Sequence, residues 1–348
     1  MTVKRNLLGL PWPALTDFFS ELGQPQYRAK QLMEWVYHHN VSDFSQMTNF
    51  PLTLRQTLAE KAVIGVGQVI ARQEAADGTV KLAIRFSSSK IVECVILRYH
   101  HGVTLCLSSQ VGCKMGCTFC ASGLDGFVTD LTTAEIIEQI WHANRELSPK
   151  NLRVGHLVYM GMGEPLDNYQ QVIDSIRFAN NPASFNIGMR NITVSTSGVV
   201  PGIRQLAEES LPLTLSISLH APLDYLRDQI MPINRRYPLA ELMAAVRDYV
   251  STTRRRVTFE YILLAGFNDQ PVHAEKLASL LAGILANVNV IPYNEVPGLP
   301  WRTPSDKQVR SFLRALEAKG INATVRRELG PEIEAACGQL RRRLQGEE

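Results

Sequence analysis

The sequence predicts an α/β protein in which a parallel sheet carries helices on its outer face. From about residue 102, short apolar segments alternate six times with amphipathic segments of helical period. Residues 1–65 have the period of short helices, whereas residues 66–101 have the alternating period of strands. We therefore expect a helical unit, then a small antiparallel sheet, then a large unit that forms an open barrel or a doubly wound sheet.

The composition is that of an ordinary globular protein, with 348 residues, 45% hydrophobic and 20% charged. A net charge of +3 permits a nucleic-acid partner without requiring one. Arg and Lys cluster locally, at 235–236, 254–256, 326–327 and 341–343, and each cluster alone indicates a solvated helix end or a tail. No apolar window is long enough to span a membrane, and Pro11 and Pro13 make the first residues a poor signal peptide. The cytoplasm is the expected location.

The first hundred residues divide at about residue 65. Helices are predicted over 12–23, 27–38 and 51–62, from apolar faces and glycine or proline stops. Strands are predicted over 66–74, 79–86 and 91–97. Asp77-Gly78 lies between the first two of these strands and is a strong hairpin signal.

The large unit is predicted to contain six strand and helix pairs. The predicted strands are 103–107, 156–160, 192–195, 213–219, 257–263 and 288–292. The predicted helices are 132–146, 168–179, 202–208, 239–250, 273–285 and 305–319.

The chemically unusual segments of the large unit each follow a predicted strand. They are a loop with three cysteines, then GMGEP (161–165), STSG (195–198), SLH (218–220), ND (268–269) and PYN (292–294). The carboxyl ends of parallel strands share one rim, and barrel enzymes build their active sites there. Taken alone, GMGEP could be a simple turn, His220 a core histidine and Asn294 a turn cap. Their position on one shared rim favours a functional role for each.

Cys113, Cys117 and Cys120 place three thiols on one short loop. Thiolates are the ligands that iron–sulfur clusters prefer, and three ligands leave one iron open to a substrate. The alternative is structural zinc with Cys106 or a histidine as the fourth ligand. Such zinc sites usually come as paired C-x-x-C knuckles, and the sequence has no second knuckle, so we favour the cluster.

Five motifs together resemble the RlmN/Cfr family of RNA methyltransferases in the radical S-adenosylmethionine (SAM) superfamily. They are LCLSSQVGC (105–113) with the cysteine loop, GMGEP, STSG, SLHAP (218–222) and AACGQL (335–340). The resemblance runs from about Leu8 to Leu340. It implies a partial (β/α)6 radical SAM barrel over 102–340, an RNA-binding helical domain over 1–65, an antiparallel β extension over 66–101, and a tail over 341–348.

The resemblance also implies cofactors and roles for single residues. Cys113, Cys117 and Cys120 would ligate a 4Fe-4S cluster whose open iron binds SAM. The implied SAM contacts are Gly163, Glu164, Ser195, Ser218, Leu219, His220 and Asn294. Cys337 matches a cysteine that becomes methylated, Cys106 its resolving partner, and Glu93 a proton acceptor. Glu93 is also conspicuous on physical grounds, because it shares an apolar strand face with Ile91 and Val95.

The implied reaction is methylation of adenine carbon 2 in 23S rRNA, and possibly in tRNA, by two SAM molecules, a methyl-Cys337 intermediate and a transient Cys106–Cys337 disulfide. Flavodoxin or ferredoxin would be the electron donor and the enzyme a monomer. Val111, where Cfr sequences tend to have cysteine, favours carbon 2 over Cfr-type carbon 8. Two other classes remain: a zinc-stabilised RNA-binding protein, and a radical SAM enzyme acting on protein or a small metabolite. The N-terminal unit and the AACGQL segment argue against the second.

Overall fold

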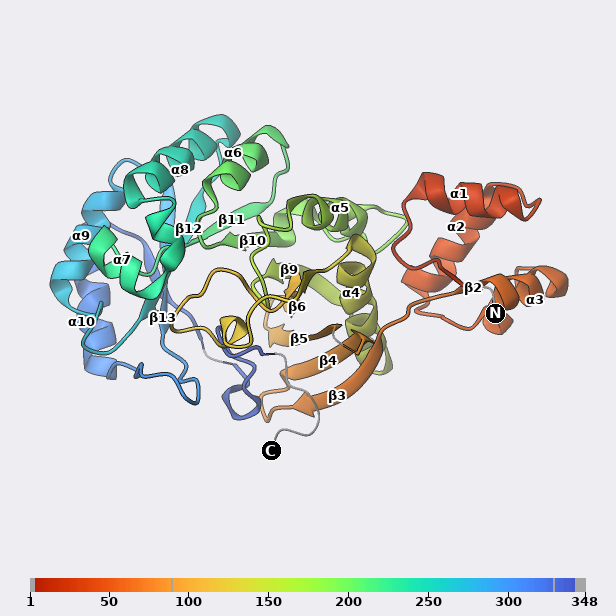
Figure 1. Ribbon diagram of the computed structural model, residues 1–348, viewed down its shortest axis with the longest axis horizontal. Coiled ribbons are helices and arrows are strands. Elements are labelled where there is room, and N and C mark those ends of the chain that lie inside the picture. Colours follow the sequence, from red (N-terminus) through yellow and green to blue (C-terminus); the bar gives the residue numbers. More distant parts are fainter. Residues whose placement is uncertain (1–3, 89, 328, 342–348) are drawn as a thin grey trace.

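The computed structural model describes residues 4–88, 90–327 and 329–341, and is built on one curved sheet of ten strands in the order β14-β13-β12-β11-β10-β9-β6-β5-β4-β3 (Figure 1). From β6 to β14 all neighbouring strands are parallel. These strands are β6 (Gly102–Cys106), β9 (Val154–Tyr159), β10 (Ile192–Thr196), β11 (Thr214–Ser218), β12 (Val257–Leu263), β13 (Ala286–Pro292) and β14 (Ala323–Val325). The predicted barrel strands are all present, and β14 adds an edge strand that the sequence did not predict.

The antiparallel extension consists of β3 (Gln68–Glu74), β4 (Val80–Ser87) and β5 (Lys90–Tyr99). β5 pairs with β6 in antiparallel fashion, with Val95 opposite Cys106. The first half of β5 therefore runs past the carboxyl end of β6. This register brings Glu93 to the same rim of the sheet as the cysteine loop.

Helices cover the outer side of the parallel strands, as Figure 1 shows. They are α4 (Thr133–Leu147), α5 (Tyr169–Asn180), α6 (Val200–Glu208), α7 (Asp224–Ile230), α8 (Leu239–Thr253), α9 (Pro271–Leu281) and α10 (Asp306–Glu317). Thr132 and Ser305 form capping boxes that begin α4 and α10. The short α7 was not predicted. The sequence interpretation of the helix over 273–285 was also too long, because α9 ends at Leu281.

The N-terminal unit contains α1 (Trp12–Glu21), α2 (Tyr27–Met33) followed by a π-helical turn (Glu34–His38), and α3 (Leu52–Lys61), with short strands β1 (Arg5–Asn6) and β2 (Ala62–Val63). It contacts the large unit through Tyr37, whose ring packs edge-on against Phe178 and Phe185 at centroid distances of 5.2 Å each. The Tyr37 hydroxyl accepts the buried Gly9 N–H at 2.8 Å. The Trp141 indole N–H also donates to Val36 O across the two units, at 3.1 Å.

After β14 the chain returns across the rim to the cysteine loop. Residues 329–341, called the C-terminal segment here, begin near the antiparallel extension, where Gly330 N–H donates to Asp77 Oδ2 at 3.0 Å. They end at the cysteine loop, where Ala121 N–H donates to Gly338 O at 2.7 Å and Ser122 Oγ to Leu340 O at 2.8 Å. These contacts bring Cys337 over the strand ends. Of the predicted tail 341–348, all but Arg341 lies outside the described residues.

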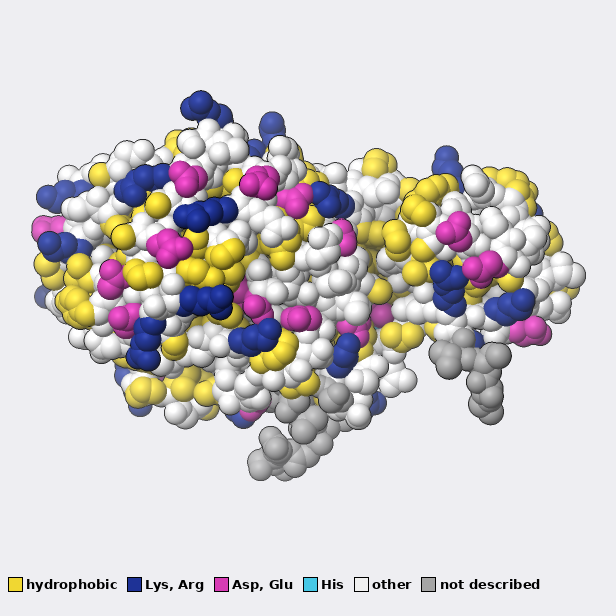
Figure 2. All heavy atoms as spheres, turned by 45° about the horizontal axis from the view of Figure 1, so that its top comes forward, with side chains coloured by type: hydrophobic (Ala, Val, Ile, Leu, Met, Phe, Trp, Pro, Cys, Tyr) yellow, Lys and Arg dark blue, Asp and Glu magenta, His cyan; other side chains and the backbone are white. Residues whose placement is uncertain are grey.

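Basic and acidic side chains are interspersed over the face seen in Figure 2, and do not gather into a single patch. This arrangement agrees with the small net charge of +3. Within the part of the chain that the structure describes, no helix has the length and apolarity needed to cross a membrane.

The buried hydrogen bond between Gly9 and Tyr37, inside the N-terminal unit, yields a prediction about stability. Tyr37→Phe removes the acceptor of the buried Gly9 N–H, so we expect the free energy of unfolding to fall by about 1–3 kcal/mol. Urea denaturation measures this change. Tyr27→Phe is the control, because Tyr27 is 55% exposed and its change should have little effect. Equal stability of the two variants would contradict this account of the hydrogen bond.

Candidate active site

The cysteine loop is held in place by its own glycines and by two distant elements. Gly112 has φ +75°, and a Cβ there would lie 1.8 Å from Gly126 O, so only glycine closes the base of this loop. Thr118 N–H donates to Ile230 O at 3.0 Å, and the indole N–H of Trp301 donates to Thr118 O at 3.0 Å. The loop is therefore braced by α7 and by the segment after β13.

All three cysteines of the loop line one cavity of about 130 Å³ at the carboxyl ends of the strands. We call this cavity the SAM lobe, after the cofactor that the resemblance implies; its other lining residues include Gly163, Glu164, Ser195, Ser218 and His220. Burial raises the pKa of each thiol, that of Cys113 to about 12. A metal that binds here must therefore displace protons from poorly acidic thiols, which iron does as it forms bonds to thiolate.

The donor set fits an iron–sulfur cluster better than a structural zinc ion. Cys106, which the zinc alternative needs as a fourth ligand, does not line the SAM lobe. Three thiols on one short loop that line a single cavity are the protein ligands that a cluster with one open iron needs.

The GMGEP loop packs against the strand that precedes the cysteine loop. Gly163 has φ +101°, and a Cβ there would lie 2.6 Å from the Cβ of Gln110. The Glu164 carboxylate accepts Ser197 N–H at 2.7 Å and Leu166 N–H at 3.0 Å. Burial raises the pKa of this carboxyl, which the two N–H groups counteract. Glu164 thus fixes the STSG loop relative to GMGEP, in addition to lining the SAM lobe.

Two hydroxyls and an imidazole come from the ends of β10 and β11. Ser195 Oγ lies 3.4 Å from Ser218 Oγ. His220 adopts φ +58°, and its Nδ1 accepts Ile262 N–H at 3.1 Å. Burial, with the Arg227 charge second, lowers the pKa of His220 to about 3, so its ring is neutral and its Nε2 carries the proton. This N–H is a hydrogen-bond donor at the SAM lobe.

Two of the residues predicted to contact SAM are absent from the lining of the SAM lobe, although Asn294 lines the adjoining cavity. The side chain of Leu219 is fully buried in the core and does not line the SAM lobe. Its carbonyl accepts the Arg227 Nε–H at 3.0 Å, and Arg227 is a buried cation that the sequence analysis did not identify. Asn294 donates from Nδ2 to Cys337 O at 3.2 Å, so its amide positions the C-terminal segment.

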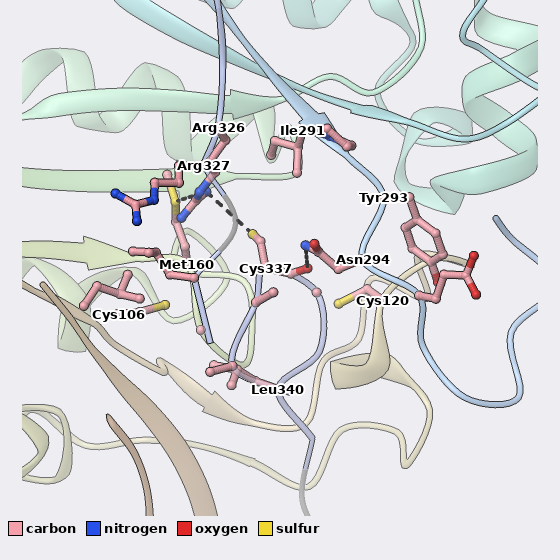
Figure 3. Close-up of a pocket in the computed structure, with 18 of the residues that line it drawn as sticks. Cys106, Cys120, Met160, Ile291, Tyr293, Asn294, Arg326, Arg327, Cys337 and Leu340 are labelled. Carbon is pink, nitrogen blue, oxygen red and sulfur yellow. Dashed lines mark hydrogen bonds between the residues drawn. The ribbon is translucent and has the colours of Figure 1, made fainter. Parts of the chain in front are cut away.

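Cys106 and Cys337 line a second cavity of about 180 Å³, which we call the thiol lobe. Cys120, Met160, Arg326 and Cys337 line both lobes, so the two cavities adjoin. In Figure 3, Cys337 lies between Cys106 on one side and Cys120 on the other. All six cysteines are free, so the disulfide implied by the resemblance is not formed in this structure.

Arg326 was interpreted from sequence as part of a solvated basic cluster, and this interpretation was wrong. It immediately follows β14, and its Nη1 lies 3.7 Å from Cys337 Sγ and 3.5 Å from Met160 Sδ (Figure 3). The missed strand explains the error, because recognising β14 would have placed Arg326 on the functional rim.

Glu93 lies at the rim but lines neither lobe. Its carboxylate is buried, 3.3 Å from Lys81 Nζ, and accepts the Arg341 N–H at 2.9 Å. The C-terminal segment therefore covers Glu93 at residue 341. The physical expectation from the sequence, that a carboxylate on this apolar strand face has a partner or a use, agrees with the Lys81 contact.

The fold and motifs match known proteins over almost the whole chain. Residues 5–64 match a family described as the ribosomal RNA large subunit methyltransferase N-terminal domain, and residues 107–278 match the radical SAM superfamily. Proteins named "Probable dual-specificity RNA methyltransferase RlmN" from Symbiobacterium thermophilum and Geobacillus kaustophilus are 49% and 45% identical. These alignments cover 98% and 99% of this chain, and 92% and 94% of the two relatives.

The chain belongs to the RlmN family of radical SAM RNA methyltransferases. The crystal structure of a radical SAM methyltransferase from Sphaerobacter thermophilus supports this, with 42% identity, a TM-score of 0.94, and coverage of 97% of this chain and 99% of that one. The predicted α/β barrel with an N-terminal helical unit is thereby confirmed. Membership in this family implies a 4Fe-4S cluster and SAM as cofactors, and the thiols of the SAM lobe fit that cluster.

The three cysteines of the SAM lobe lead to a prediction about the iron content of the protein. Protein purified without oxygen should carry about four irons per chain and absorb visible light. Changing Cys113, Cys117 and Cys120 together to alanine should abolish both properties, as iron analysis and absorbance would measure. Cys94→Ala is the control, because Cys94 is buried and lines neither lobe. Zinc in place of iron, or iron retained by the triple variant, would refute the assignment.

Proposed function

We propose that this chain methylates carbon 2 of an adenine in 23S rRNA and in tRNA, in the cytoplasm, through a methyl group carried on Cys337. The observation that carries the proposal is that Cys337 lines both the SAM lobe and the thiol lobe. One sulfur can therefore face the cofactor in one step and the resolving thiol in another.

The SAM lobe would hold both cofactors. Cys113, Cys117 and Cys120 would ligate the 4Fe-4S cluster, and Gly163, Glu164, Ser195, Ser218 and His220 would surround SAM. When bound, the cluster and SAM supply a 5′-deoxyadenosyl radical that removes one hydrogen atom. The neutral His220 ring would donate its Nε2–H to SAM without adding charge. Leu219 has a side chain enclosed in the core, so it would contribute through its own backbone. Asn294 would contribute by holding the backbone of Cys337 with its side-chain amide.

Cys337 would act first as a nucleophile and then as a carrier. Its thiolate takes a methyl group from one SAM, and this methyl loses a hydrogen atom in the presence of the second. The methylene carbon then bonds to the adenine, which joins protein and RNA covalently. An adenine carbon between two ring nitrogens is electron-poor, so it does not attack SAM directly. The carrier sulfur avoids this obstacle.

Glu93 would remove the ring proton after the carbon–carbon bond has formed, and the one electron that had been given to SAM would return to the cluster, when present, which leaves a closed-shell adduct. The Glu93 carboxylate forms a buried ion pair with Lys81, at 3.3 Å from Nζ. The Arg341 N–H now occupies one carboxylate oxygen. The ring proton would therefore reach an oxygen that the C-terminal segment already contacts, or the other oxygen, which faces Lys81.

Cys106 would complete the reaction by attacking the Cys337 sulfur. The carbon–sulfur bond breaks, the methylated RNA is released, and the two cysteines form a transient disulfide. The two thiols line the same lobe without being bonded, which is the arrangement this last step needs.

The substrate and partners are inferred from the relatives and the resemblance. The N-terminal match to a large-subunit ribosomal RNA methyltransferase domain supports 23S rRNA, and the name "dual-specificity" supports a second RNA, which we take to be tRNA. Val111 lines neither lobe, so carbon 2 over carbon 8 rests on the likeness to RlmN proteins. We further propose that the enzyme is a monomer and that flavodoxin or ferredoxin is its reductant. Its domains would be an RNA-binding domain over 1–65, a β extension over 66–101 and a catalytic core over 102–340.

The choice of substrate atom is tested in cells. RNA from a strain that lacks the gene should lose 2-methyladenosine from both 23S rRNA and tRNA, as mass spectrometry of digested RNA would measure. Restoring the gene should return the modification, whereas a gene with the three cluster cysteines changed to alanine should not. Loss of 8-methyladenosine would show the Cfr-type reaction instead, and no change in either nucleoside would refute both.

The roles of the two thiols are tested in the purified enzyme. Cys106→Ala should stop the reaction with RNA bonded to the protein, because the methylene bridge forms but is not resolved. Cys337→Ala should form no bond to RNA and no product. A denaturing gel of each variant with SAM, reductant and RNA would show a nuclease-sensitive shifted band for Cys106→Ala alone. Both variants should keep iron, and normal turnover by either would exclude its role.

A further inference from the structure

The guanidinium of Arg326 has sulfur atoms where buried cations usually have carboxylates. Its Nη1 donates toward Met160 Sδ at 3.5 Å and Cys337 Sγ at 3.7 Å. Within residues 4–88, 90–327 and 329–341, no carboxylate lies within salt-bridge distance of it. The carboxylate that acts on its charge, Glu260, is bound instead by Ser216 Oγ and Asn289 Nδ2, both at 2.8 Å. A guanidinium directed at two sulfur atoms is suited to stabilise a thiolate that forms beside it.

Arg326 is also placed where such an anion would form. It lines the SAM lobe, the thiol lobe and a third cavity at the opposite end of the barrel, of about 330 Å³. Burial opposes its charge, yet the neighbouring Cys337, Glu260, Tyr99 and Cys106 groups hold the pKa of Arg326 above its usual value. The cation is therefore permanent, and the groups that change charge are the thiols beside it.

Cys106 is the thiol whose ionisation this cation would favour. It is a buried residue at the end of β6, and burial raises its pKa to about 12. Cys337 raises that pKa further, whereas Arg326 is the charged group that lowers it. The other titratable groups coupled to Cys106 are Cys94 and Tyr99, both of which ionise to anions. A thiol in this setting is a weak nucleophile unless a cation stabilises its thiolate.

We propose that Arg326 is a positioning residue for thiol exchange, stabilising the Cys106 thiolate and holding the Cys337 sulfur in line with it. In this step the Cys106 sulfur bonds to the Cys337 sulfur, and the bond from that sulfur to the methylene carbon of the RNA adduct breaks. The electron pair leaves with the carbon, which takes a proton from water, and the two cysteines end oxidised as a disulfide. The inference rests on the two-thiol reaction proposed above.

The test follows the RNA adduct through a single turnover of the cluster-containing enzyme. In the wild type, the shifted band should appear and decay. Arg326→Gln should slow the decay of the adduct at least tenfold. A higher pH should restore the decay rate of this variant, because a higher pH raises the thiolate fraction of Cys106. Arg326→Lys should recover most of the rate at neutral pH, since it restores a cation. Arg314→Gln, which removes an exposed charge of α10 that lines neither lobe, should leave the decay of the adduct as in the wild type.

Three outcomes would overturn the inference. Adduct decay unchanged in Arg326→Gln would show that the cation does not act in the exchange. Weaker SAM binding with unchanged decay would instead make Arg326 an anchor for the SAM carboxylate. Slow decay in both Arg326 variants at every pH, with full iron content, would indicate a purely structural role. Absence of an adduct in the wild type would instead refute the proposed function itself.

Discussion

The whole site depends on holding the backbone of Cys337 at the open end of the barrel. The Asn294 amide binds the Cys337 carbonyl at 3.2 Å, and Ala121 N–H binds the next carbonyl at 2.7 Å. One bond comes from the end of β13 and the other from the end of the cysteine loop. The same segment that presents the sulfur is thus tied to the loop that would carry the cluster. Because the proposed reaction uses this one sulfur in two steps, its placement constrains the geometry of both lobes.

A rigid polar framework supports this placement from beneath. Arg227 is fully buried, and its guanidinium binds the carbonyls of Ser197 and Leu219, at 2.6 and 3.0 Å. Burial lowers its pKa to about 10, which still leaves it charged at neutral pH. Glu164 binds the STSG loop from the other side. The strand ends are therefore fixed before any ligand arrives, which lowers the cost of ordering a cofactor.

Sequence reasoning succeeded where the signal is local. The three cysteines, Gly163 and His220 follow strands whose apolar runs are easily recognised, and the shared rim follows from the parallel sheet. It failed where the contact is distant in sequence. β14 has only three residues, so Arg326 gave no sign that it reaches Met160 and Cys337. The position of Asn294 beside the thiol lobe likewise depends on the path of the C-terminal segment, and no residue pattern specifies that path.

The most direct test of the central claim asks which sulfur faces the cofactor. The enzyme is incubated with methyl-labelled SAM in the absence of RNA, and the cysteine peptides are analysed by mass spectrometry. If Cys337 lies where both lobes meet, the label should appear on Cys337 alone, and it should disappear when substrate RNA and reductant are then added. Label on Cys106, or a Cys337 that stays unlabelled while RNA is methylated, would contradict the account.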